Sequence, residues 1–128
     1  MPEFRNIHVF DLMKYRLPWA GKVSILHRVS GLLMFLLIPF VLYLFDKSIT
    51  SEISFSTFKA VLANPFAKLV ILALIWSYLH HFCAGIRFLM LDLHKGIDKK
   101  SSAQSAVTVL IFSLSLTAVC AAKLFGLF

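Results

Sequence analysis

Charged residues are scarce in this sequence of 128 residues, and the acidic ones are the scarcest. Asp, Glu, Lys and Arg make up 15% of the chain, and 59% of its residues are hydrophobic, for a mean hydropathy of +0.84. Soluble domains carry about 25% charged residues. The charged groups here are too few to coat a small soluble globule, and the length leaves no room for a second domain of ordinary size. The composition therefore excludes a soluble enzyme and a disordered chain.

Cysteine is also rare. Cys83 and Cys120 both lie in apolar runs, and no second cysteine stands at a short spacing from either. This distribution excludes a disulfide-stapled scaffold. We expect both thiols to behave as small buried hydrophobic side chains.

Three long apolar runs dominate the sequence. Each is near the roughly 20 residues that a transmembrane helix needs, and none alternates with the two-residue period of a barrel strand. The sequence therefore predicts an all-α membrane protein with three transmembrane helices, in a single membrane domain spanning residues 1–128. The predicted helices cover residues 22–45, 65–93 and 102–127, and an interfacial segment, residues 1–21, precedes them.

Local signals predict where these helices begin, bend and end. Asn64, followed by proline, is typical of an N-cap before the first helical residue. Ser101 and Gln104 predict a capping box that opens the third helix. Gly96 is expected to end the second helix, and Pro39 to kink the first.

Basic residues near the helix ends indicate the orientation in the membrane. Nine belong to the N-terminal segment and the second connection: Arg5, Lys14, Arg16, Lys22, Arg28, Arg87, Lys95, Lys99 and Lys100. Four belong to the first connection and the C-terminus: Lys47, Lys59, Lys68 and Lys123. Because cytoplasmic loops carry the excess of Lys and Arg, we expect a cytoplasmic N-terminus and a C-terminus on the opposite side.

Polar residues cluster at the start of the first span. Ser24, His27, Arg28 and Gly31 follow one another at spacings of three, four and seven from the first, which places them on one helix face, with Ser30 off that face. A hydroxyl, an imidazole and a guanidinium at this depth could form a pocket for a ligand that bears oxygens. Alternatively, Arg28 anchors the helix to lipid headgroups while the small residues pack against other helices.

The second span carries two adjacent histidines. His81 shares a face with Ser77 and Gly85, whereas His80 points about 100° away. A neutral imidazole within a span is a good axial ligand for haem iron, and a nearby glycine could admit a flat macrocycle. An intramembrane histidine can equally be an interhelical hydrogen-bond donor. The spacing does not choose between the two histidines.

Two further charged residues stand near the end of the second span. We expect Arg87 and Asp92 to act there as interfacial anchors. The third span carries only small hydroxyl residues, which can pack helices, and Lys123, which can reach the membrane surface. No chemistry is predicted for it.

Two segments make the sequence recognisable. Residues 24–31 read SILHRVSG, and residues 81–92 read HFCAGIRFLMLD, with the histidine, glycine, arginine and aspartate at fixed spacing. Together they resemble the two signatures of the cytochrome b membrane-anchor subunit, the C subunit, of succinate dehydrogenase, respiratory complex II. The resemblance covers nearly the whole chain.

The resemblance implies roles for four of these residues. Ser24 and Arg28 would line a ubiquinone pocket, and His27 and Arg28 would approach the haem propionates. His81, four residues before the glycine, would be the axial ligand of the haem b iron, which selects it over His80. A second anchor subunit would supply the other axial ligand.

The resemblance also implies an assembly. The chain would serve as the membrane anchor of a succinate:ubiquinone oxidoreductase in the bacterial inner membrane, with a cytoplasmic N-terminus, a periplasmic C-terminus and no activity by itself. FAD and the iron–sulfur clusters would belong to a flavoprotein and an iron–sulfur subunit, and no nucleic acid would take part. The alternatives are the anchor of a related fumarate reductase and a non-catalytic membrane scaffold.

Overall fold

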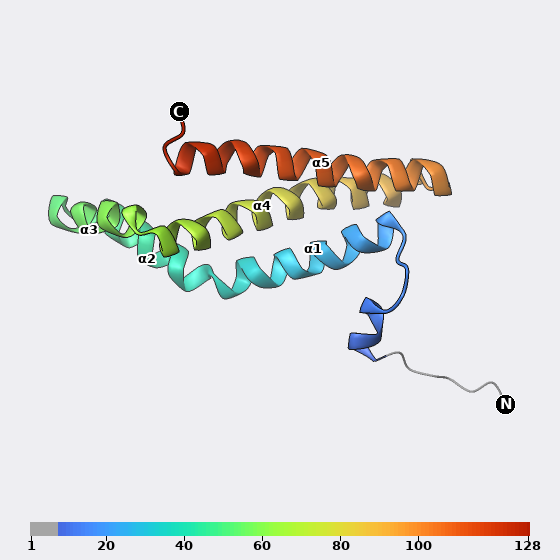
Figure 1. Ribbon diagram of the computed structural model, residues 1–128, viewed down its shortest axis with the longest axis horizontal. Helices are drawn as coiled ribbons and strands as arrows, with labels where there is room; N and C mark the ends of the chain where they lie inside the picture. The colour runs from blue at the N-terminus through green and yellow to red at the C-terminus, as the bar shows by residue number, and fades with distance from the viewer. Residues whose placement is uncertain (1–7) are drawn as a thin grey trace.

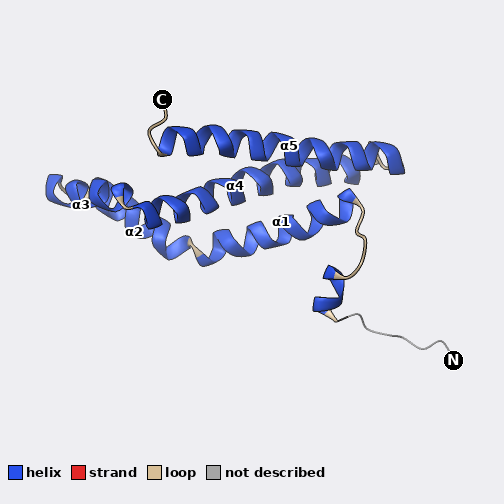
Figure 2. Ribbon diagram, viewed as in Figure 1, coloured by secondary structure: helices blue, strands red, loops and turns tan. Residues whose placement is uncertain are grey.

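Helices account for nearly all of residues 8–128, which the computed structural model describes, and this part of the chain contains no strand (Figure 2). The elements are the 3-10 helix η1 (Val9–Met13) and the α-helices α1 (Trp19–Leu36), α2 (Ile38–Ile49), α3 (Glu52–Ala63), α4 (Pro65–Asp92) and α5 (Lys99–Leu124). The predicted second span agrees with α4. The predicted first span is divided between α1 and α2, and the third begins three residues earlier than expected.

The long helices α1, α4 and α5 run side by side, with α4 between the other two (Figure 1). The α4–α5 connection and the start of α1 lie at one end of this bundle, and α2, α3 and the C-terminus lie toward the other. By length and composition α4 and α5 can each cross a membrane, and the bent pair of α1 and α2 can form a third span. The predicted fold class, an all-α membrane protein, is confirmed.

The predicted kink at Pro39 is confirmed. Helix α1 ends at Leu36 and α2 begins at Ile38, and their axes differ by 48°. Pro39 lies in the first turn of α2. Because proline has no backbone N–H and its ring clashes with the preceding turn, one continuous helix cannot pass through this position without bending.

The predicted cap at Asn64 is also confirmed. Its side-chain oxygen accepts hydrogen bonds from the backbone N–H groups of Phe66 and Ala67, at 2.8 and 3.3 Å. The helix before it, α3, is one that we did not predict. It begins with a capping box in which the Ser51 and Ser54 side chains each accept from the other residue's backbone N–H.

The predicted capping box at Ser101 is wrong, because α5 begins earlier, at Lys99. Its N-cap is Asp98, whose carboxylate accepts a hydrogen bond of 3.0 Å from the Ser101 backbone N–H. Hydrogen bonds from Ser101 hold the pKa of the Asp98 carboxyl below its usual value. Ser101 therefore lies within the first turn as the donor to the cap.

The prediction that Gly96 ends the second helix is wrong as well. Helix α4 ends at Asp92, and His94 takes the left-handed conformation, with φ of 57°, at the position that glycine usually fills. The N–H groups of His94 and Lys95 then bond to the carbonyls of Leu91 and Met90, as in a Schellman motif. Gly96, with φ of 68°, follows in the loop.

At its N-terminal end, the described chain starts with η1 and reaches α1 at Trp19. The predicted interfacial segment, residues 1–21, therefore includes the first turn of α1. Its residues 1–7, and with them Arg5 from the charge count, lie outside the described residues.

Small and polar side chains fill the interior between the three long helices. Val23, Ala84 and Ala106 are fully buried, and Val109 is nearly so. The buried polar residues are Ser30, Ser77, His80, Arg87 and Ser113. Small residues allow close approach of helices in a membrane, and hydroxyls can bond to the helix backbone, as Ser77 does to the Ala73 carbonyl at 2.8 Å.

The burial of Arg87, Cys83 and Cys120 can be compared with what we predicted for them. Arg87 is 5% exposed and points inward, so its predicted place as an interfacial anchor is wrong. Cys83 and Cys120 are free thiols and are only partly buried. Cys83 packs against the buried cluster of Val23, Ala84, Ala106 and Val109.

Candidate functional site

Helices α1 and α4 bring two histidines from distant parts of the chain face to face. The rings of His27 and His81 stack with their centroids 4.0 Å apart and their planes 10° from parallel. Phe88, two turns after His81 on α4, meets the His27 ring edge-on at 5.1 Å. Both segments singled out in the sequence therefore meet at one place.

Helix α1 holds one nitrogen of His81. Nδ1 of His81 lies 3.0 Å from the backbone carbonyl oxygen of His27 and 3.3 Å from Oγ of Ser30. Ser30 is fully buried, and its hydroxyl donates to the same His27 carbonyl at 2.8 Å. Because a carbonyl oxygen can only accept, the proton of a neutral His81 belongs on Nδ1, and the lone pair on Nε2 is available to a ligand.

Two glycines provide room around this pair. A Cβ added to Gly31 would lie 3.0 Å from Cε1 and 3.3 Å from Nδ1 of His81. A Cβ at Gly85 would lie 3.9 Å from Nε2 of His27. Gly31 is thus required for the close approach of His81 to α1, whereas the space at Gly85 is less tight.

This close approach predicts the effect of a single methyl group. In the Gly31→Ala variant, either His81 or the α1–α4 spacing must shift, and overpacking of this kind costs about 1–3 kcal/mol. Gly21→Ala, on the same helix as Gly31, is the matched control. Its added Cβ would make only ordinary contacts of 3.6–3.9 Å, with Pro18 and Leu17. Thermal unfolding in detergent should show Gly31→Ala clearly less stable than Gly21→Ala. Equal stability of the two variants would contradict the contact.

The adjacent His80 occupies a different environment. It is fully buried inside the bundle, stacks on Trp76 at 5.3 Å, and neither of its ring nitrogens has a hydrogen-bond partner among the described residues. His81 is only partly buried. A large ligand approaching from outside the bundle can therefore reach His81 but not His80.

The other two predicted residues lie outside this histidine cluster. Arg28 is exposed and Ser24 is partly buried, both on α1. The structure brings together His27 and His81, but no hydrogen bond joins Ser24 or Arg28 to them within residues 8–128. Arg28 is therefore accessible from outside the bundle, whereas Ser24 is partly covered.

Ser30 is a site residue that we did not predict. It lies off the helix face that runs from Ser24 to Gly31, but it follows His27 by three residues, a spacing that places the two side chains on the same side of α1. That spacing is the signal in the sequence that indicates Ser30.

No group of three or more His, Cys, Asp or Glu side chains suited to a metal ion lies within the described part of the chain.

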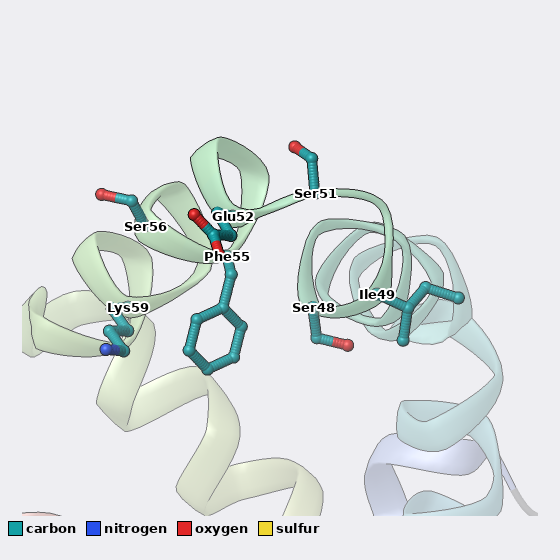
Figure 3. A pocket seen from close by; sticks show the side chains of 7 residues that line it. All are labelled: Ser48, Ile49, Ser51, Glu52, Phe55, Ser56 and Lys59. Carbon is teal, nitrogen blue, oxygen red and sulfur yellow. The ribbon is translucent and has the colours of Figure 1, made fainter.

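A hollow far from the histidines is unrelated to them. It lies between the end of α2 and α3, lined by Ser48, Ile49, Ser51, Glu52, Phe55, Ser56 and Lys59 (Figure 3). The Phe55 ring points into it, and the ammonium of Lys59 lies 4.9 Å from that ring. None of its lining residues was predicted to bind a ligand.

Comparison with known proteins covers both segments. The family model described as succinate dehydrogenase/fumarate reductase transmembrane subunit matches residues 5–120. The chain is 35% identical over 104 residues to the succinate dehydrogenase cytochrome b556 subunit of Coxiella burnetii, covering 80% of this chain and 83% of that one. It is 25% identical over 105 residues to the subunits of the same name from Paracoccus denitrificans, with 82% and 81% covered, and Rickettsia felis, with 80% of each covered. The chain therefore belongs to the succinate dehydrogenase/fumarate reductase transmembrane subunits, as a cytochrome b membrane anchor of succinate dehydrogenase.

Proposed function

We propose that this chain binds haem b together with a second anchor subunit and helps to form the site at which a succinate dehydrogenase reduces ubiquinone. The observation that carries the proposal is the geometry of His81, whose Nδ1 is engaged by the His27 carbonyl and whose Nε2 keeps its lone pair. Metal-bound histidines commonly hold their second nitrogen in this way.

The residues around His81 fit a haem. His81 is partly exposed on the bundle, so a second subunit could bring its own ligand from outside, and Gly31 allows the ring to lie close to α1. His81 would ligate the iron, and His27 and Arg28 would bind the propionates. When bound, haem b takes up and releases single electrons.

Ser24 and Arg28 would bind the quinone. The Ser24 hydroxyl is a donor, and the Arg28 guanidinium presents a rigid fork of donors with a permanent positive charge. Quinone reduction places negative charge on the carbonyl oxygens, so donors already in place stabilise the reduced forms. Arg28 is exposed on this chain by itself, which suits a site completed by other subunits.

The iron–sulfur and flavoprotein subunits would supply the iron–sulfur clusters and FAD, and this chain by itself would have no activity. Its alternative role is as the anchor of a fumarate reductase, because the matching family model covers both enzymes. The two differ in the direction of electron flow, which depends on the quinone potential and on the partner subunits.

The test is the colour of the complex purified from mild detergent with its partners. We expect flavoprotein and iron–sulfur subunits to co-purify and the complex to show a haem b reduced-minus-oxidised spectrum. A complete complex without that spectrum would overturn haem binding by this chain. Reduction of ubiquinone by succinate, compared with oxidation of a quinol by fumarate, distinguishes the two directions.

The charge distribution also leads us to propose a cytoplasmic N-terminus and a periplasmic C-terminus. The N-terminal segment and the second connection together carry nine of the 13 basic residues. The start of α1 and the α4–α5 connection lie at one end of the bundle, and the C-terminus lies toward the other (Figure 1). A protease added to spheroplasts should remove a tag fused after Phe128 and spare a tag fused before Met1. The reverse pattern would overturn the orientation.

A further inference from the structure

Arg87 is a buried positive charge with only neutral partners. Its Nε donates to Oγ of Ser105 at 2.9 Å, and its Nη2 donates to the carbonyl and Oγ of Ser102 at 3.1 and 3.0 Å. No carboxylate forms an ion pair with it within residues 8–128. These bonds join α4 to α5 and leave the charge uncompensated, although a buried charge is costly without a counter-charge.

Arg87 also lines a groove between α4 and α5. The groove has a volume of about 420 Å³, and its lining includes Cys83, Ile86, Met90 and Val109 together with Arg87 and Lys95. Lys95 comes from the loop after α4 and is exposed. The groove thus combines a largely apolar wall with two cations, close to the end of a transmembrane helix.

This combination matches one class of ligand available to a membrane protein. An acyl chain fits an apolar wall at membrane depth, and a phosphate group matches paired cations near the helix end. A free phosphate would gain nothing from the apolar wall, and a zwitterionic headgroup would bring its own positive charge close to the two cations.

We propose that the groove between α4 and α5 binds one anionic phospholipid, with its phosphate at Arg87 and Lys95 and an acyl chain along Ile86 and Met90. The bound phosphate supplies the counter-charge that the serines cannot. The proposal depends on the membrane location of the chain and not on haem or quinone binding.

The test uses the whole complex, stripped of lipid in detergent and titrated with phosphatidylglycerol or phosphatidylcholine. Binding is followed by native mass spectrometry and by the rise in unfolding temperature. We expect phosphatidylglycerol to bind at least about tenfold more tightly than phosphatidylcholine. Equal affinity for the two lipids would overturn the proposal.

Two lysine variants localise the site. Lys95→Gln should weaken phosphatidylglycerol binding about fivefold, the factor that corresponds to about 1 kcal/mol for one basic residue near an anionic lipid. Lys100→Gln removes the same charge from an exposed residue outside the groove and should change nothing. If both variants behave alike, the lipid preference is a general effect of charge and the proposed site is wrong.

Arg87→Gln should abolish the preference for the anionic lipid. Because that change also removes bonds between α4 and α5, Lys95→Gln keeps the proposal testable if Arg87→Gln does not assemble. A third probe is Met90→Cys, since Met90 is 46% exposed beside the groove. Cross-linking from this thiol to a partner subunit would show that protein, and not lipid, covers the groove, and would overturn the proposal.

Discussion

Replacement of His81 by alanine is expected to remove haem b from the complex or to change its spectrum fundamentally. Loss of a residue that only orients a metal ligand costs about 10–100-fold in metal affinity, and loss of the ligand itself should cost at least as much. The measurement is the haem content per flavin of the purified complex, together with the reduced-minus-oxidised spectrum.

His80→Phe is the matched control. It changes the neighbouring histidine on the same helix and keeps a ring to stack on Trp76. Because neither nitrogen of His80 has a partner among the described residues, their removal should cost little. We expect His80→Phe to keep its haem. An unchanged spectrum in His81→Ala, with all subunits still present, would show that His81 is not the ligand.

Replacement of Arg28 by alanine should lower succinate-dependent ubiquinone reduction on the order of 100-fold, the usual cost of losing one preorganised donor to a developing oxyanion. Succinate oxidation with a soluble artificial acceptor should persist, because that reaction bypasses the membrane subunits. The ratio of the two rates, measured on the same preparation, isolates the quinone step.

Two further variants sharpen the Arg28 experiment. Arg28→Lys keeps the charge but loses the rigid fork, so its ubiquinone reduction should be intermediate. Lys22→Ala removes a basic residue one to two turns earlier on the same helix, where the Lys22 ammonium lies over the Trp19 ring at 4.3 Å, and should reduce neither rate appreciably. Equal loss of both activities in Arg28→Ala would indicate failed assembly instead of a role in quinone binding.

Much of the fold could be read from local features. The long apolar runs, the cap at Asn64 and the bend at Pro39 depend on residues within a few positions of each other, and the structure agrees with them. The errors at Ser101 and Gly96 were also local. Asp98 takes the N-cap position that was predicted for Ser101, and His94 takes the left-handed position that was predicted for Gly96. In both cases the alternatives lie only two or three residues apart in the sequence.

The class of protein and the two segments from which the candidate site is built follow from the amino-acid sequence, because hydrophobicity and helical spacing are properties of each segment alone. Which side of each helix faces inward depends instead on how the helices pack against one another. The packing of α1 on α4 buries Ser30 against His81 and leaves Arg28 exposed, and the packing of α4 on α5 turns Arg87 inward. His80, next to His81, is fully buried inside the bundle. Adjacent residues on a helix differ by only about 100°, so the neighbouring helix determines which of them is buried and which can meet a ligand.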